Sequence, residues 1–235
     1  MLVNRLRHYI CEPRIYLLIA LALLPLLAAA HNVSDANARF VEGLDGAAIA
    51  PFMYLGAKHM VTGYDHLLYL LGVLFFLRQF RDVLIYVSLF TLGHSITLIA
   101  GVLADLNVNA YIVDTIIGLS VVYKAFENLN GFKQTFGFQL NAKLAVFGFG
   151  LCHGLGLATK LQELALSTDS LLINMISFNV GVEFGQALAL AFIVTLLMQW
   201  RQRAGFQRHA FIANTALMVM GFILAGYQFA GYLWA

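Results

Sequence analysis

Long apolar runs separated by short polar segments dominate the pattern along this chain. Each run is long enough for an α-helix to cross the hydrocarbon core of a bilayer, which takes ~20 residues. The pattern predicts an all-α integral membrane protein. Its six transmembrane helices are expected at residues 51–77, 83–106, 110–126, 140–161, 172–200 and 211–233.

A further apolar run precedes these six and has the features of a secretory signal peptide. It combines three arginines, a short apolar stretch and three small residues: Arg5, Arg7, Arg14, residues 15–27 and residues 28–30. We predict that residues 1–30 are cleaved, which makes His31 the mature N-terminus. Residues 31–50 then form a short periplasmic lead-in, and residues 51–235 form the transmembrane domain. The alternative is an uncleaved first transmembrane helix.

Basic residues gather in alternate loops. The odd-numbered loops and their edges hold eight of them: Arg78, Arg81, Lys124, Lys133, Lys143, Arg201, Arg203 and Arg208. The even-numbered loops hold only Lys160. Because Lys and Arg accumulate in cytoplasmic loops, the odd-numbered loops are predicted to be cytoplasmic and both mature termini periplasmic.

Composition excludes several other classes of protein. Only 11% of the residues are charged and 61% are hydrophobic, whereas a soluble domain is about 25% charged. The net charge of +2 gives no reason to expect a nucleic-acid partner. Two cysteines cannot form a disulfide framework.

Two short matches suggest an internal repeat. Residues 63–66 (Gly-Tyr-Asp-His) resemble residues 150–153 (Gly-Leu-Cys-His), 87 positions later. Residues 90–94 resemble residues 178–182, 88 positions later. Three spans per repeat would invert one half relative to the other, which is the plan of many transporters.

Gly150 and Gly154 form a G-x-x-x-G pattern, which is typical of close helix packing.

Side chains suited to metal binding lie near the middle of four runs: His59, Asp65, His66, His94, His153 and Glu183. An ionised group at the bilayer centre costs at least ~2.5–3.5 kcal/mol, so such groups usually face an interior site. At about 100° per residue, His59 and His66 share a helix face, with His59 ~10 Å further out. We predict one shared site with His59 as an outer waystation. A single membrane histidine can instead serve as an interhelical hydrogen-bond partner.

The donor types indicate which ion such a site would hold. Imidazole nitrogen combined with carboxylate oxygen suits Ni, Co, Zn or Cu(II), whereas Mg and Ca prefer oxygen alone. Two ionised carboxylates, Asp65 and Glu183, would balance the charge of one divalent cation. At a cleaved N-terminus, the amine and imidazole of His31 are a candidate second chelate with two nitrogens. The alternative is that cleavage simply exposes a histidine that has no metal-binding role.

Several motifs resemble those of the HupE/UreJ family, and of its second branch, across residues 31–235: His59 with Asp65-His66, Gly93-His94, Cys152-His153-Gly154 and residues 179–186. The resemblance implies a six-span inner-membrane protein with a cleaved signal, and nickel or cobalt permease activity as in its better-known members. By motif match it implies metal binding by His59, Asp65, His66, His94, His153 and Glu183. Residues 155–159 lack the second histidine and the acid that the nickel-permease branch carries there.

Three classes of function remain open. The first, which we favour, is a divalent-metal permease. The second is an intramembrane zinc-dependent hydrolase in which the metal activates water, with Ser95 beside His94. The third is an accessory or sensor protein that binds metal without moving it. The predicted partners are the metal ion, membrane lipid, and either a metalloenzyme-maturation protein or a second copy of the chain.

Overall fold

Helices make up most of the chain that the computed structural model describes, which is residues 46–162 and 170–234. No strand occurs within these ranges. The predicted signal peptide, His31 and most of the predicted lead-in lie outside the described residues. The all-α prediction is confirmed for the part of the chain that is described.

In the described part of the chain, four helices are long and apolar enough to cross a membrane: α6 (Phe80–Leu103), α9 (Ala142–Gln162), α10 (Leu171–Arg201) and α11 (Phe206–Trp234). They lie within a few residues of four predicted spans and make the chain a multi-pass membrane protein. The third predicted span is occupied by α7 (Ala110–Asn128), which carries Asp114, Lys124 and Glu127. A short helix that was not predicted, α8 (Gly131–Phe136), follows it.

The first predicted span is divided into two helices, α4 (Ile49–Thr62) and α5 (Tyr64–Leu74). Gly63 between them is extended, with φ −72° and ψ 104°, so its backbone leaves the helical path. The helices have 14 and 11 residues, or about 21 Å and about 17 Å at ~1.5 Å per residue. Neither half reaches the ~30 Å of a hydrocarbon core. The prediction of one continuous helix over 51–77 is therefore wrong.

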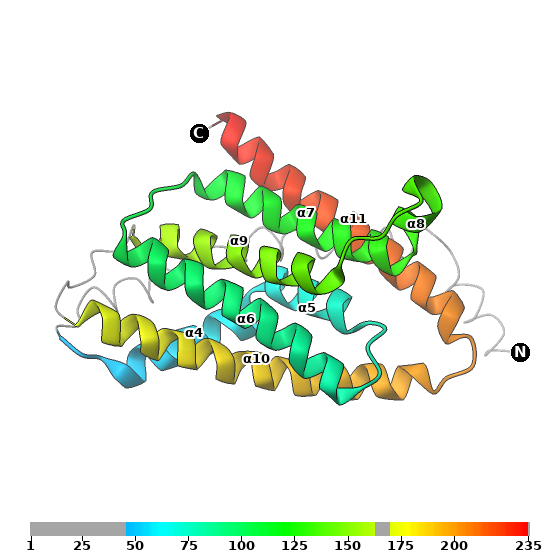
Figure 1. The fold of residues 1–235 in the computed structure, drawn as a ribbon, viewed down its shortest axis with the longest axis horizontal. Helices are drawn as coiled ribbons and strands as arrows, with labels where there is room; N and C mark the ends of the chain where they lie inside the picture. Colours follow the sequence, from blue (N-terminus) through cyan, green and yellow to red (C-terminus); the bar gives the residue numbers. More distant parts are fainter. Residues whose placement is uncertain (1–45, 163–169, 235) are drawn as a thin grey trace, which may run out of the picture.

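Six of the described helices pack as three close pairs, α4 with α10, α6 with α9 and α7 with α11 (Figure 1). Glycines bring α6 and α9 together, because a Cβ atom at Gly150 would collide with the carbonyl oxygen of Phe90. A Cβ atom at Gly154 would collide with the carbonyl oxygen of His94. The G-x-x-x-G pattern therefore does mediate close packing. The numbering rises in the same direction along α6 and α9, so this pair is parallel.

The α4–α10 pair is built in the same way. A Cβ atom at Gly56 would collide with the carbonyl oxygen of Phe178, and one at Gly181 with that of Met53. Gly185 approaches Ala57 one turn further on, so this pair is also parallel. In contrast, Gly118 contacts Ala225 and Gly231 contacts Tyr111, which makes α7 and α11 antiparallel.

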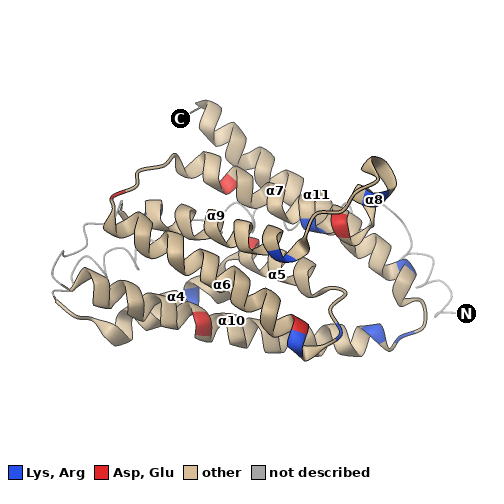
Figure 2. Ribbon diagram, viewed as in Figure 1, with Lys and Arg blue, Asp and Glu red and all other residues tan. Residues whose placement is uncertain are grey.

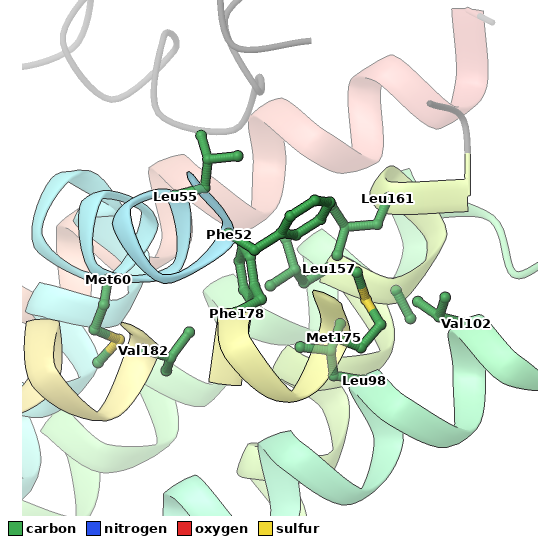
Figure 3. Packing of buried hydrophobic residues seen from close by; sticks show 11 residues of the cluster. Phe52, Leu55, Met60, Leu98, Val102, Leu157, Leu161, Met175, Phe178 and Val182 are labelled. Carbon is green, nitrogen blue, oxygen red and sulfur yellow. The ribbon is translucent and has the colours of Figure 1, made fainter. Parts of the chain in front are cut away.

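An apolar layer fills the space between α4, α6, α9 and α10 (Figure 3). Phe52, Leu98, Leu157 and Met175 are buried within it. Leu98 follows His94 by one turn, and Leu157 follows His153 by one turn. The layer therefore lies on the side of these histidines where α4 and α10 begin and where α6 and α9 end.

Charged residues mark the two ends of the bundle differently (Figure 2). Lys and Arg concentrate at the end that carries the α5–α6, α7–α9 and α10–α11 connections. At that end the Arg201 guanidinium donates hydrogen bonds to the carbonyl oxygens of Leu74, Phe75 and Leu77 at 2.6–2.8 Å. It thereby caps the end of α5, and we call this end of the bundle the basic end.

Candidate metal centre

The break at Gly63 places three of the predicted metal-binding residues around one point. His59 lies in the last turn of α4, and Asp65 and His66 lie in the first turn of α5. A helix C-terminus carries partial negative charge and favours a cation, whereas a helix N-terminus favours a carboxylate. The break therefore creates an electrostatic environment that suits both a bound cation and an ionised Asp65.

His66 is the centre of a cluster to which three other histidines contribute. Its ring centroid lies 4.8 Å from that of His59, 5.0 Å from His153 and 6.1 Å from His94. Two overlapping groups, His59-His66-His94 and Asp65-His66-His153, each offer three ligand atoms that lie within 4.8 Å of one another. Helices α4, α5, α6 and α9 thus supply potential ligands to one site.

Hydrogen bonds orient two of the rings. The Nδ1 atom of His153 lies 2.7 Å from the carbonyl oxygen of Phe149. A carbonyl oxygen only accepts, so this nitrogen carries the proton and Nε2 keeps a lone pair. The Nδ1 atom of His66 lies 3.0 Å from Oδ1 of Asp65, and an ionised carboxylate selects the same tautomer. Such outer hydrogen bonds are what fixes a metal-binding imidazole in orientation and tautomer.

The site is buried among aromatic rings. Asp65, His66, His94 and His153 are 1–4% exposed, while His59 is half-buried. Phe90 lies 4.9 Å from His153 between ring centroids. Within the described chain, Nε2 of His66 and both ring nitrogens of His94 have no hydrogen-bond partner. A buried polar nitrogen without a partner costs free energy, and a bound cation would remove that cost at these atoms.

Glu183 does not join this cluster, contrary to the sequence-based expectation. Its side chain is exposed on α10. The buried face of α10 is centred near Val182, and one residue rotates a helix by about 100°. Glu183 is therefore turned away from the face that packs inward. The buried polar residues of this motif are instead Asn179 and Gln186.

His59 is much closer to His66 than a straight helix allows. The expected separation was ~10 Å along the axis, whereas the ring centroids are 4.8 Å apart. The extended backbone at Gly63 changes the path of the chain between the two histidines, which brings the rings together. The structure thus places His59 at the edge of the central cluster and not at a separate outer position.

Two further contributors were missed in the sequence. The Tyr69 ring lies 5.6 Å from that of His153, and its hydroxyl is buried. Tyr69 follows His66 by three residues on one helix, which is the signal that would have indicated it. The hydroxyl of Thr91 donates a hydrogen bond to Oε1 of Gln186 and so joins α6 to α10 beside His94. Thr91 precedes His94 by three residues.

Comparison with known proteins gives one match. A protein-family model described as "HupE / UreJ protein" matches residues 19–235, which include every residue of the histidine cluster. A search of curated proteins and a search of solved structures each find no significant match.

Proposed function

Because this chain belongs to the HupE/UreJ family, whose members are associated in general with nickel or cobalt uptake, we propose that it transports a divalent transition-metal ion across the bacterial inner membrane. One observation carries the proposal: four histidines converge at a break in a membrane helix, and His66 is the central one of the four. Discontinuous helices of this kind mark ion sites in many transporters. The ion is the substrate.

The donors present suit nickel and cobalt ahead of the alkaline-earth ions. Four imidazoles and one carboxylate form a borderline donor set, to which zinc and copper(II) also bind. Asp65 supplies negative charge in the first turn of α5, where the helix N-terminus stabilises it. It either ligates the ion or holds His66, and both roles require the carboxylate.

We further propose that six segments cross the membrane, with α4 and α5 together forming the first. The basic end of the bundle then faces the cytoplasm, since Lys and Arg accumulate there. The Lys124–Glu127 pair, at 2.6 Å, belongs to this end. The connection that contains Asp105 lies at the other end and faces the periplasm, as do both mature termini.

Topology can be tested with single cysteines in a background that carries both Cys11→Ser and Cys152→Ser. Cysteines at 78, 81 and 203 should react with a membrane-impermeant reagent only from the cytoplasmic side, and a cysteine at 107 only from the periplasm. The intact mass of the protein purified from membranes should begin at His31. Reaction of both groups from one side would contradict the topology, whereas an intact chain from Met1 would contradict the cleavage of residues 1–30.

An inverted repeat of three spans each is supported by the helix contacts, in a register that differs from the sequence match. Gly56 meets the Phe178 carbonyl as Gly150 meets the Phe90 carbonyl. In this register, Gly56-Ala57-Lys58-His59 is the counterpart of Gly150-Leu151-Cys152-His153. Residues 63–66, which the sequence match had chosen, have no such contact with α10 among the neighbours of Gly63. His59 and His153 would then be equivalent ligands from the two halves.

The two sides of the cluster differ in a way that suits transport. The apolar layer of Phe52, Leu98, Leu157 and Met175 separates the cluster from the proposed periplasmic side, and apolar constrictions can act as gates. On the cytoplasmic side, a cavity of about 520 Å³ is lined by Lys124, Glu127 and several amides. Tyr69, which follows His66 by three residues along α5 towards this end of the bundle, contacts His153.

Flux of Ni²⁺ or Co²⁺ into liposomes that contain the purified protein tests the proposal. We expect the parent protein to transport and Asp65→Asn to reduce the initial rate by roughly 10–100-fold, the usual cost of losing a partner of a metal ligand. The matched control is Asp105→Asn, because Asp105 is an exposed loop residue with φ 50°, which asparagine tolerates. It should transport at the parent rate.

The same experiment separates the permease from the other two classes. Stoichiometric metal binding without flux for Ni²⁺, Co²⁺, Zn²⁺ and Cu²⁺ would reject transport and leave the accessory or hydrolase functions. Hydrolysis would in addition require a metal-dependent product from a lipid or peptide substrate. No binding of any of these ions would reject the site itself.

A further inference from the structure

An apolar groove opens on the flank of the bundle, between α5, α10 and α11. It has a volume of about 450 Å³ and is lined by residues that include Tyr64, Leu68, Leu71, Phe192, Trp200 and Met220. The groove exists because α10 and α11 meet at a short connection and diverge from there (Figure 1). Between them the short helix α5 forms the floor.

The groove has the length of one leaflet. It begins at Tyr64, next to the mid-membrane break, and reaches Trp200 in the last turn of α10. On α10 it covers Phe192 to Trp200, which at ~1.5 Å per residue corresponds to roughly 12 Å. Half of a ~30 Å hydrocarbon core is about 15 Å. One acyl chain of the leaflet at the basic end therefore fits it.

Arginines occur at the end of α10 and in the α5–α6 and α10–α11 connections, at the basic end of the groove. Arg201 follows Trp200 and caps α5, whose leucines line the groove. Arg78 follows Leu77, whose carbonyl oxygen accepts a hydrogen bond from the Arg201 guanidinium, so two like charges lie near one another here and repel. Arg78 and Arg203 are exposed, and neither forms an ion pair with a carboxylate in the described part of the chain. An anion bound here would relieve this repulsion.

We infer that this groove and its arginines bind an anionic phospholipid, with an acyl chain along α5 and the phosphate between Arg78 and Arg203. The apolar lining matches hydrocarbon, and the uncompensated positive charge at headgroup depth matches a phosphate. Basic pockets between membrane helices on the cytoplasmic side recognise anionic headgroups in this way. The inference depends on the membrane setting and not on metal transport.

Trp200 provides a reporter for this lipid. The chain has two tryptophans, Trp200 and Trp234, so Trp234→Phe leaves fluorescence from the groove alone. In phosphatidylcholine vesicles we compare quenching by phosphatidylglycerol or phosphatidylcholine that carries bromine on the acyl chains. We expect brominated phosphatidylglycerol to bind with an apparent affinity at least about fivefold higher, since each arginine near an anionic headgroup contributes about that factor.

The double variant Arg78→Gln, Arg203→Gln should lose the preference for phosphatidylglycerol, while both brominated lipids still quench the fluorescence of Trp200. The matched control is Lys133→Gln with Lys143→Gln, which removes the same charge from exposed positions at the same end of the bundle. It should keep the preference. Equal quenching by both lipids in the parent, or equal loss in both double variants, would overturn the inference. Weak quenching by either lipid together with a dimer in crosslinking would also overturn it, because a second copy would then fill the groove.

Discussion

Replacing His66 with alanine should lower the affinity for Ni²⁺ or Co²⁺ by at least about 100-fold, more than the loss of any single outer partner. His66 belongs to both three-residue groups of the cluster, so its removal leaves neither complete. Equilibrium dialysis of the purified protein against each ion measures the effect. Helix content from circular dichroism establishes that the variant assembles.

Two control variants test whether the loss of affinity is specific to the histidine cluster. His209→Ala removes an exposed histidine at the start of α11 and should not change the affinity. Glu183→Gln should also leave it unchanged, because the Glu183 side chain is exposed on α10 outside the cluster. Parent-like affinity in His66→Ala would contradict a shared site. A large loss in Glu183→Gln would restore the role that the family motif implies for this residue.

Gly150→Leu should separate α6 from α9 and destabilise the protein by several kcal/mol. A Cβ atom at this position would collide with backbone of Phe90, which cannot yield as a side chain does. Overpacking alone typically costs ~1–3 kcal/mol, and a leucine would also push His94 and His153 apart. We expect a large drop in the thermal midpoint measured in detergent, together with loss of metal binding.

Gly148→Leu is the matched control for this effect. It lies on the same helix two residues earlier, and nothing lies within 4 Å of a Cβ atom at that position. It should retain the parent midpoint and affinity. Equal destabilisation by both substitutions would contradict a specific contact with α6 at Gly150, because leucine is the better helix former and cannot destabilise through helix propensity.

The positions of the helices could be predicted because apolar runs and basic loops are local signals. The division of the first span could not, since Gly63 lies in an apolar run and glycine also occurs within continuous membrane helices. The histidines could be assigned to one site by depth and type. The position of Glu183 outside the site could not be predicted. Lipid-facing and core-facing residues are both apolar in this chain, so the sequence does not indicate which face of α10 is buried.

The repeat illustrates the same limit. The first span contains two G-x-x-H sequences, at 56–59 and at 63–66, and the offset of 87 favoured the second because the other match has an offset of 88. Contacts between helices favour the first, because Gly56 meets α10 at backbone distance. Register between distant helices depends on packing that a four-residue match does not contain.

During biosynthesis, the broken helix formed by α4 and α5 leaves the ribosome long before its packing partner α10. Met53 of α4 contacts Gly181 of α10 but precedes it by 128 residues. An extended backbone and an ionised Asp65 are unfavourable in lipid until other helices cover them. This segment therefore makes a poor substrate for early lateral release from the translocon. Its final insertion has to wait for the second half of the chain, so truncated chains that end before α10 should remain sensitive to extraction by alkali.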